Sequence, residues 1–494
     1  MRRKRTIYFN DARHYYLFVF EPPMTMQDAH RPVDECAGTT VDTFVYGVAR
    51  DDGLFYPSKV GHRFTNGQPP EESSDFHLAA YWRLWHNMQS LMDRGLDPLS
   101  VLIDRAHEKG MDFFASLRLG GYGDMDPAHN VRNGGRGFVH PHVRERHFNV
   151  LRELAHDYRT DGVELDFAAG SGGSAPVLSE QDVPEHTSTM TQWVCEVSKM
   201  VRSGAEGAPG QLGARVYPLE RLNRAAGFDV RTWLKEGALD YVIPMVYSHN
   251  LVESTMPIDW LIDAAHEADT SVYPMVQPDY QMEGERSHCA QEHATPAMMR
   301  AAAANFWEQD ADGLATWFLK WPLEDTEHRI LCELGDPDLV RQSTKHYLVN
   351  RKTSGSERAG YQTVLPIEIE ASDIGTRHAV PFVVADDLEA AAGRIRQVLL
   401  KVRINDLVSE DRITILLNGE SLANETCLRD FGHAYVHWAA MWLELHLESV
   451  RPRKGRNLLE FVLVGRPDGL VSPLIIEDVE VVVEYGAYPS GLRS

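Results

Sequence analysis

Two carboxylic acids stand at alternate positions of one short apolar run. The run covers residues 163–167, and the acids are Glu164 and Asp166. Because side chains alternate across a β-strand, both carboxyl groups lie on one face of the predicted strand and the apolar side chains lie on the other. Burying a carboxylate without partners costs several kcal/mol, so this face must line a solvated cavity or a network of cations and hydrogen bonds. The pattern is typical of an active-site strand.

Glycoside hydrolysis is the chemistry that two carboxyl groups suggest first. It uses one protonated acid, which gives a proton to the leaving oxygen, and one ionised acid, which attacks or activates water. Asp166 lies nearest the end of the predicted strand and is the first catalytic candidate. Glu164 lies one pleat deeper, where a neighbouring carboxylate favours a raised pKa and a role as proton reservoir or orienting group. The alternative for Glu164 is structural, an ion pair with Arg118 or Lys320.

A further catalytic carboxyl is expected from another strand, because acids two positions apart do not flank a glycosidic bond by themselves. Asp279 is the first candidate and Glu21 the second, since each follows a predicted strand. The alternative for Asp279 is a solvated loop acid without a catalytic role.

Short apolar runs alternate with helical segments from Tyr15 to about Glu333. This alternation predicts parallel strands joined by helical crossovers. The expected strands cover 15–20, 43–48, 112–117, 163–167, 213–217, 241–246, 272–276 and 314–318. The expected helices cover 26–36, 98–109, 142–158, 187–202, 220–235, 258–268, 296–308 and 324–334. These units fit a (β/α)8 TIM barrel over residues 1–338. A doubly wound open sheet is the alternative, but no Gly-rich phosphate loop follows the first strand.

A barrel enzyme carries its functional residues just after each strand. The residues expected there to bind substrate are Glu21, Arg118, Tyr247, His249, Trp317 and Lys320. Tyr247 and His249 suit hydrogen bonds to sugar hydroxyls, and Trp317 suits stacking on a sugar ring. Arg118 and Lys320 suit an anionic group on the sugar. Structural alternatives stay open for these residues, namely core packing of Trp317 and neutralisation of the acid pair by Arg118 or Lys320.

Two long insertions, 49–97 and 119–138, follow the second and third predicted strands. Loops at that end of a barrel shape the substrate site. Trp82 and Trp85 in the first insertion either stack on a sugar or form one face of a packed helix.

The sequence predicts neither a metal nor a cofactor. His140 and His142 flank a proline that suits a helix start, and no third ligand is apparent nearby, so we interpret both as helix-start residues. The five cysteines are far apart and odd in number, which favours free thiols in a reducing compartment over disulfides or a zinc site.

The pattern changes beyond about Asp338. From residue 345 to 494 the chain is a series of short β-type runs separated by turn residues such as Asn418-Gly419. This spacing predicts a C-terminal β-sandwich domain. Such a domain either binds carbohydrate or buttresses the barrel, and both roles stay open.

The charge balance excludes some partners. With 72 Asp and Glu against 49 Lys and Arg, the net charge is −23, which repels nucleic acid and anionic membranes. The basic start, Met1–Arg5, lacks the apolar run of a signal peptide, and no run reaches the ~20 residues of a membrane span. We expect a soluble, cytoplasmic protein whose partner is a carbohydrate.

Three motifs together resemble a known family. They are His140-Pro-His-Val-Arg144, Asp161-Gly-Val-Glu-Leu-Asp166 and Tyr241-Val-Ile-Pro-Met-Val-Tyr247. This set is similar to the glycosyl hydrolase-like proteins related to family ten, over roughly the first two-thirds of the chain. The resemblance implies a TIM barrel, with Asp166 in the place of the family's strand-four aspartate and Tyr247 in that of its strand-six tyrosine. It also has a departure, since a chitinase-like strand has its proton donor where this chain has Ala168.

The sequence therefore predicts a glycosidase that cleaves O-glycosidic bonds of an oligo- or polysaccharide. Two alternatives stay open. One is a barrel that binds carbohydrate, or serves as a scaffold, without catalysis. The other is a lyase on uronate polysaccharides that uses Arg118, Tyr247 and His249 rather than paired acids.

Overall fold

The computed structural model describes most of the chain. The described residues are 2–10, 14–50, 53–69, 79–120, 126–167, 176–204, 210–245, 252–281, 291–349, 363–430 and 440–486. They fall into two compact units. The first unit comprises the described parts of Met1–Asn250, Pro257–Met275 and Gln309–Gly335, and the second those of Leu251–Met256, Val276–Glu308 and Asp336–Ser494.

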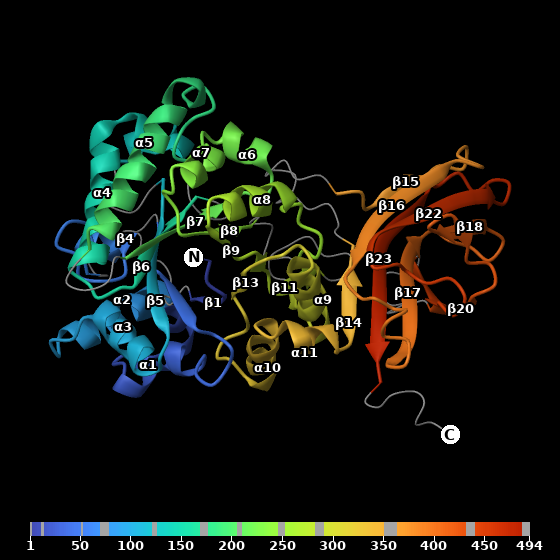
Figure 1. The fold of residues 1–494 in the computed structure, drawn as a ribbon, viewed down its shortest axis with the longest axis horizontal. Helices are drawn as coiled ribbons and strands as arrows, with labels where there is room; N and C mark the ends of the chain where they lie inside the picture. The colour runs from blue at the N-terminus through green and yellow to red at the C-terminus, as the bar shows by residue number, and fades with distance from the viewer. Residues whose placement is uncertain are drawn as a thin grey trace. The chain divides into compact units, whose positions relative to one another are not determined.

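A curled, barrel-like parallel sheet forms the centre of the first unit (Figure 1). Its order is β10-β13-β1-β2-β5-β6-β7-β8-β9. The strands are β1 (Arg5–Asn10), β2 (Thr43–Gly47), β5 (Asp112–Arg118), β6 (Gly162–Asp166), β7 (Gln211–Val216), β8 (Tyr241–Pro244), β9 (Ser271–Val272), β10 (Met275–Val276) and β13 (Gly313–Trp317). They are almost wholly buried, as parallel strands covered on both faces must be.

The two end strands of this order are neighbours in the chain. Only Tyr273 and Pro274 separate β9 from β10. The backbone N–H of Asp312 donates to the carbonyl of Val272, and that of Ala315 donates to the carbonyl of Pro274. One segment of chain therefore begins and ends the strand order.

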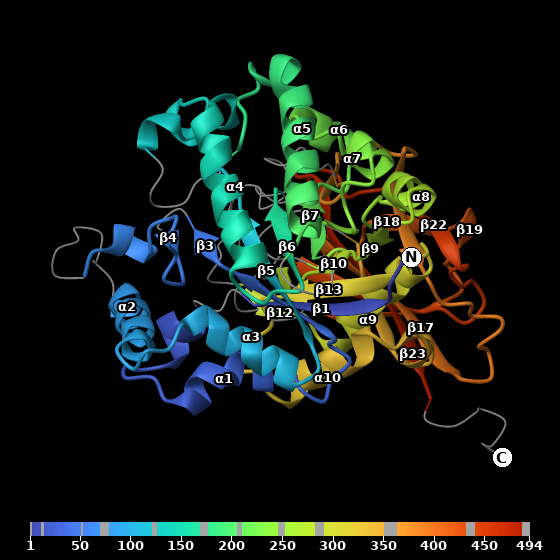
Figure 2. The ribbon, with the colours of Figure 1, turned by 60° about the vertical axis from the view of Figure 1, so that its left-hand side comes forward.

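Helices lie along the outside of the sheet, with α4 and α5 against β6 and β7 (Figure 2). The helices of this unit are α1 (Met26–Asp34), α2 (Ala79–Met92), α3 (Pro98–Glu108), α4 (Pro141–His156), α5 (Val183–Arg202), α6 (Glu220–Ala225), α7 (Val230–Lys235), α8 (Asp259–Glu267) and α10 (Asp325–Leu334). Local signals start them. For example, the Asp97 carboxylate accepts hydrogen bonds from the N–H groups of Leu99 and Ser100 at the start of α3. No helix among the described residues is long and apolar enough to cross a membrane.

Most of the expected elements occur in the structure, with three corrections. The expected strand over 272–276 is two short strands, β9 and β10. The expected helix over 220–235 is two helices, α6 and α7, because Gly227 adopts a positive φ of 82° after α6. The expected strand at 15–20 is wrong, since Tyr15–Val19 forms a single π-helical turn and the first strand is β1. The hydrophobic pattern did not predict β1, because this strand begins with Arg5 and ends with Asn10. Both polar residues are nevertheless buried.

The second unit contains two antiparallel sheets that share one apolar core. The larger sheet has the order β14-β23-β17-β21-β20, with β15 also on β23, and the smaller has the order β16-β22-β18-β19. Their strands are β14 (Lys345–Leu348), β15 (Ile367–Ile369), β16 (Arg377–Val384), β17 (Ile395–Asn405), β18 (Arg412–Leu417), β19 (Glu420–Ser421), β20 (Thr426–Asp430), β21 (Ala440–His446), β22 (Gly455–Gly465) and β23 (Leu474–Tyr485). Helices α9 (Pro296–Trp307) and α11 (Pro337–Arg341) and the short pair β11 (Asp279–Gln281) and β12 (Gln291–His293) also belong to this unit.

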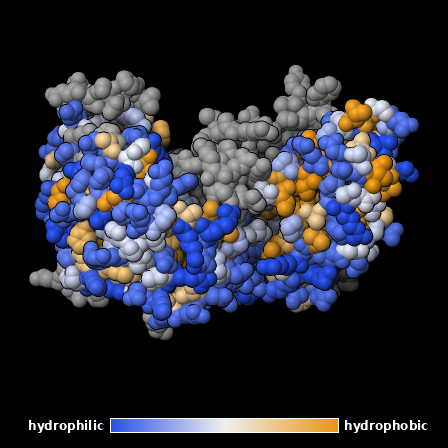
Figure 3. Space-filling view, turned by 90° about the horizontal axis from the view of Figure 1, so that it is seen from above, coloured by the Kyte–Doolittle hydropathy of each residue, from blue (hydrophilic) through white to orange (hydrophobic). Residues whose placement is uncertain are grey.

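The surface is mostly hydrophilic in the face drawn in Figure 3, with smaller apolar groups between the polar residues. Some exposed apolar side chains lie on β22, where Leu458 is 38% and Val464 is 44% exposed. Scattered apolar residues of this kind are normal on a protein surface.

Candidate active site

Glu164 is buried and held by three neighbours. Its Oε1 accepts hydrogen bonds from Ser116 Oγ at 2.8 Å and Arg215 Nε at 2.7 Å. Its Oε2 accepts a longer one from Tyr241 O–H, at 3.3 Å. Burial raises the pKa of Glu164, and the Arg215 charge and the Ser116 hydrogen bond oppose that rise. Glu164 is therefore a fixed, fully enclosed group.

Asp166 lies at the end of the same strand between two guanidinium groups. The register pairs it with Arg118 on β5 and with Arg215 on β7. Its Oδ2 lies 3.4 Å from Arg118 Nε and 4.0 Å from Arg215 Nη1. Two cations thus offset the charge of the acid pair, which makes its burial tolerable.

Arg215 is the centre of this network. It is fully buried, and its guanidinium carbon lies 3.8 Å from the ring centre of Phe9 and 5.6 Å from that of Trp317. A planar guanidinium stacks on aromatic faces while it donates in its own plane, which an ammonium cannot do. The sheet therefore holds a cation against aromatic rings beside two acids.

Glycine on β7 makes room for the deeper part of the network. A Cβ atom on Gly213 would lie 2.0 Å from the Tyr241 ring. This ring carries the hydroxyl that reaches Glu164, and burial raises its pKa well above the ordinary value, so it stays a neutral donor. Gly213 thus allows the hydrogen bond from Tyr241 to Glu164.

Sequence reasoning found the two acids and Arg118 but missed Arg215, Ser116 and Tyr241. The expected partner of Glu164 was Arg118 or Lys320, and the observed partner is Arg215. One signal was present, since Arg215 and Gly213 alternate in the apolar run 213–217 as the acids do in theirs.

Three other expected site residues lie elsewhere. Glu21 does not follow a strand, and its carboxylate pairs with Arg83 Nε at 2.5 Å with its side chain 71% exposed. Lys320 is exposed beside Glu324 at 3.3 Å rather than deep in the sheet. Asp279 lies on β11 of the second unit, where its Oδ1 is 2.9 Å from His293 Nδ1.

Trp317 is on β13 and is fully buried. Its ring packs edge-on against Phe9 and Phe318, with centroid distances of 5.8 Å and 4.5 Å. This is the core packing that the sequence left as an alternative to stacking on a sugar. Tyr247, His249 and Ala168 lie outside the described residues.

The insertion aromatics divide between core and surface. Both tryptophans are on α2, where Trp85 is 5% exposed and Trp82 is 44% exposed. Arg63 covers the Trp85 ring with its guanidinium carbon 3.7 Å from the ring centre. Trp85 therefore packs within the unit, which agrees with a packed helix face rather than stacking on a sugar.

Three imidazole rings gather at the start of α4. The sequence indicated His140 and His142, and the structure adds His129, whose ring centre lies 4.9 Å and 4.6 Å from theirs. Among the residues that the structure describes, no group of His, Cys, Asp or Glu is arranged to hold a metal ion.

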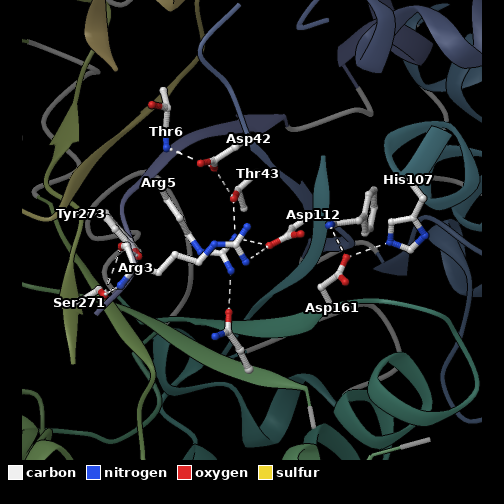
Figure 4. A network of polar contacts seen from close by, with 12 residues as sticks. Arg3, Arg5, Thr6, Asp42, Thr43, His107, Asp112, Asp161, Ser271 and Tyr273 are labelled. Carbon is white, nitrogen blue, oxygen red and sulfur yellow. Dashed lines mark hydrogen bonds and ion pairs between the residues drawn. The ribbon is translucent and has the colours of Figure 1, made fainter. Parts of the chain in front are cut away.

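A second polar network lies at the opposite, amino end of the same sheet (Figure 4). Arg5 Nη1 donates to Thr43 Oγ1 and Asp112 Oδ2 at 2.5 Å and 2.7 Å, and its Nη2 donates to Gln211 Oε1 at 2.7 Å. Arg3 also binds Asp112. The amino end of a barrel sheet serves stability, whereas the carboxyl end carries chemistry.

Comparisons with known proteins find remote structural likeness alone. No family model matches the sequence, and no curated protein matches it. Solved structures of low similarity include an endo-1,4-β-mannanase from Rhizomucor miehei, with 13% identity, coverage of 69% of this chain and 94% of that one, and a TM-score of 0.42. The glycoside hydrolase domain of PgaB (BpsB) from Bordetella bronchiseptica has 12% identity, coverage of 67% and 98%, and a TM-score of 0.42.

A cycloisomaltooligosaccharide glucanotransferase from Paenibacillus sp. also matches, with 10% identity, 96% of this chain and a TM-score of 0.35. This chain spans 57% of the length of that protein. TM-scores below 0.5 carry no argument about activity, so the chemistry has to be argued from the site itself.

Proposed function

We propose that the protein is a glycoside hydrolase that cleaves O-glycosidic bonds of an oligo- or polysaccharide. The observation that carries the proposal is the position of Asp166. It ends the central strand β6 at the carboxyl end of the sheet, between Arg118 and Arg215. That edge of a parallel barrel is where catalytic side chains lie. Asp166 serves as the ionised carboxylate that attacks the sugar or activates water.

Glu164 has a different role in this proposal. Its oxygens accept hydrogen bonds from Ser116, Arg215 and Tyr241 and it lies one pleat deeper than Asp166, so it orients the neighbouring groups. The proton donor then comes from another segment, and Asp279 is the candidate from its place after the seventh predicted strand. Arg118, Tyr247 and His249 are the proposed substrate-binding residues. Trp317 is buried in the core, and Lys320 and Glu21 are exposed beside Glu324 and Arg83.

We infer the architecture at a finer level as well. The common chain segment of β9 and β10 supports a closed eight-strand barrel, because these two strands then count as one. The two C-terminal sheets with their common core support a β-sandwich domain over residues 345–494, after a barrel domain over 1–338.

One observation favours a second candidate, a carbohydrate-binding barrel without catalysis. Glu164 and Asp166 are both fully buried and both lie beside arginines, so the pair is compatible with a purely structural network. A hydrolase and a binding protein differ in turnover alone, which a single substitution tests.

The test is an Asp166→Asn variant, compared with the wild type on a panel of oligo- and polysaccharides by release of reducing ends. We expect turnover to fall by about 10²–10⁴-fold, since a positioned acid–base group contributes that much. Asp161→Asn is the matched control, because Asp161 lies just before the other end of β6 and accepts a hydrogen bond from the Phe113 N–H at 2.7 Å. It should stay within about twofold of the wild type.

The outcome separates the candidates. Equal turnover in Asp166→Asn and wild type would remove Asp166 from the mechanism. Binding of a saccharide by calorimetry without release of reducing ends by either protein would favour the non-catalytic barrel. An unsaturated product detected by absorbance would identify a lyase.

A further inference from the structure

We propose that Arg215 is a positioning residue that couples the two acids of the candidate site. It sets the orientation of Glu164 through a hydrogen bond and that of Asp166 through charge. This inference rests on the proposed function, because it assigns Arg215 a part in the turnover that Asp166 carries out.

The first argument is the position of the guanidinium between the two acids. Nε donates to Glu164 Oε1 at 2.7 Å, and Nη1 lies 4.0 Å from Asp166 Oδ2. The two carboxyl groups alternate on β6, and Arg215 is the register partner of Asp166 on β7. One group on the neighbouring strand therefore contacts both acids at once.

The second argument is that the guanidinium is held rigidly. It stacks on Phe9 at 3.8 Å and lies near Trp317, and all three side chains are buried. A guanidinium that packs on an aromatic face keeps its N–H groups free to donate in its own plane. The packing therefore holds the group between the two carboxyl groups.

The third argument is unused hydrogen-bonding capacity. Arg215 Nη1 and Nη2 are buried, and neither makes a hydrogen bond within the part of the chain that the structure describes. Buried donors without acceptors are rare and call for an explanation, of which a functional role is one. Nη1 lies 4.0 Å from Asp166 Oδ2, just beyond hydrogen-bonding distance. A shift of about 1 Å would bring the two atoms within that distance.

These features give Arg215 a defined task during hydrolysis. A catalytic carboxylate changes its charge when it bonds to the sugar or takes a proton from water. Arg215 keeps its hydrogen bond to Glu164 throughout and stabilises the charge of Asp166 through Nη1 while that carboxylate is ionised. Glu164 serves as the resting partner that keeps the guanidinium in place.

The test compares three variants of Arg215 with a matched control. Arg215→Met removes the charge, Arg215→Lys keeps the charge without the planar stack, and Arg215→Gln with Glu164→Gln removes the buried pair together. Arg5→Lys is the control, because Arg5 is a second buried arginine of the same sheet, stacked on Phe114 at 5.1 Å, but lies at the amino end. Each is assayed for kcat, KM and the pH dependence of kcat, with folding checked by circular dichroism.

We expect kcat to fall by about 10²-fold in Arg215→Met and in the double variant, with KM within about threefold, because misplacing a reacting group costs that much. In Arg215→Lys, kcat should fall less, and the acid limb of the pH profile should stay at its wild-type position. In Arg215→Met the acid limb moves to higher pH, because the variant loses the cation that lies beside both carboxyl groups. Arg5→Lys should lower stability and leave kcat and the acid limb unchanged.

A merely structural role for Arg215 predicts lower stability with wild-type kcat and an unmoved acid limb, and that result overturns the proposal. A second measurement needs no substrate, namely carbon-13 NMR titration of the labelled Glu164 carboxyl in wild type and the Arg215→Lys and Arg215→Met variants. If Asp166→Asn abolishes hydrolysis but the Arg215 variants do not change it, the proposed function stands and the role of Arg215 is wrong. If the titration moves but the wild type cleaves no saccharide, the proposed function is wrong and the role of Arg215 in turnover falls with it.

Discussion

Two acids on one strand face acquire different properties from their neighbours. Glu164 accepts hydrogen bonds from a hydroxyl, a guanidinium and a phenol, whereas Asp166 has a guanidinium on each side. Enzymes that use paired carboxyl groups assign their roles through such differences in environment. In the proposed mechanism, one pleat of depth separates Glu164, which orients its neighbours, from Asp166, which reacts.

Glu164 should be the more important of the two for stability. Replacing it with Gln leaves Arg215 buried with its main partner neutral, and breaking a buried ion pair in this way typically costs about 3–5 kcal/mol. We expect the free energy of unfolding, measured by urea denaturation, to fall by about 3 kcal/mol in Glu164→Gln. Ser116→Ala, which removes one neutral donor to the same oxygen, should cost about 1 kcal/mol. Equal stability of Glu164→Gln and the wild type would contradict the ion-pair account.

The acids were visible in the sequence because alternation within five residues is a local signal. The partner was not, since Arg215 meets Glu164 across 51 residues of chain and only the register of β6 against β7 brings them together. The predictions for two exposed residues were wrong because no local signal showed their exposure. Glu21 and Lys320 have the right chemistry, but nothing local to them records that their side chains turn to solvent.

At the scale of elements, the apolar runs predicted β2, β5, β6, β7, β8 and β13 but missed β1. This strand carries Arg5 and Asn10 at its ends, so its pattern is that of a polar segment. Buried Arg5 is stabilised by hydrogen bonds to Asp112, Thr43 and Gln211, which lie on three other strands. A central strand of this kind is recognisable only after its neighbours are known.

Helix α4, which supports β6 from outside, contains a buried histidine. His147 Nδ1 donates a hydrogen bond to the Val143 carbonyl at 2.9 Å, and its ring packs on Phe138 at 4.8 Å. Burial lowers the pKa of His147 to about 4, because the charged imidazolium cannot be hydrated there.

The lowered pKa of His147 predicts that the protein becomes less stable in acid. Between its ordinary value of 6.5 and about 4, the unfolded chain binds a proton at His147 that the folded protein does not bind. The free energy of unfolding therefore falls as the pH drops through this window, by about 3 kcal/mol from this residue. His147→Gln removes the titrating group and should flatten that part of the curve, measured by urea denaturation at several pH values. An unchanged pH dependence would show that the proton is taken up elsewhere.

At the scale of the whole molecule, the second unit has its own buried ion pair. Asp386 accepts hydrogen bonds from Lys345 Nζ at 2.7 Å, Tyr347 O–H at 2.7 Å and Tyr485 O–H at 2.6 Å. These partners lie on β14 and β23, so one carboxylate connects two neighbouring strands of the larger sheet with the end of β16. Lys345 and Asp386 are each almost completely buried.

Asp386→Asn should therefore weaken the second unit. The change removes the charge that balances the buried Lys345 ammonium, which keeps the Arg341 and Ser343 carbonyls as neutral acceptors, and burial already lowers the pKa of Lys345. We expect the free energy of unfolding of this unit to fall by about 3–5 kcal/mol, with faster amide hydrogen exchange in β14 and β23 than in the wild type. Lys345→Met combined with Asp386→Leu should recover part of the loss, because apolar side chains replace the charged pair while the Tyr347 and Tyr485 hydroxyls lose their acceptor. Asp338→Asn is the control, since its pair with Arg341 is exposed and contributes little. If Asp386→Asn changes exchange in β14 no more than Asp338→Asn does, the pair does not hold these strands together.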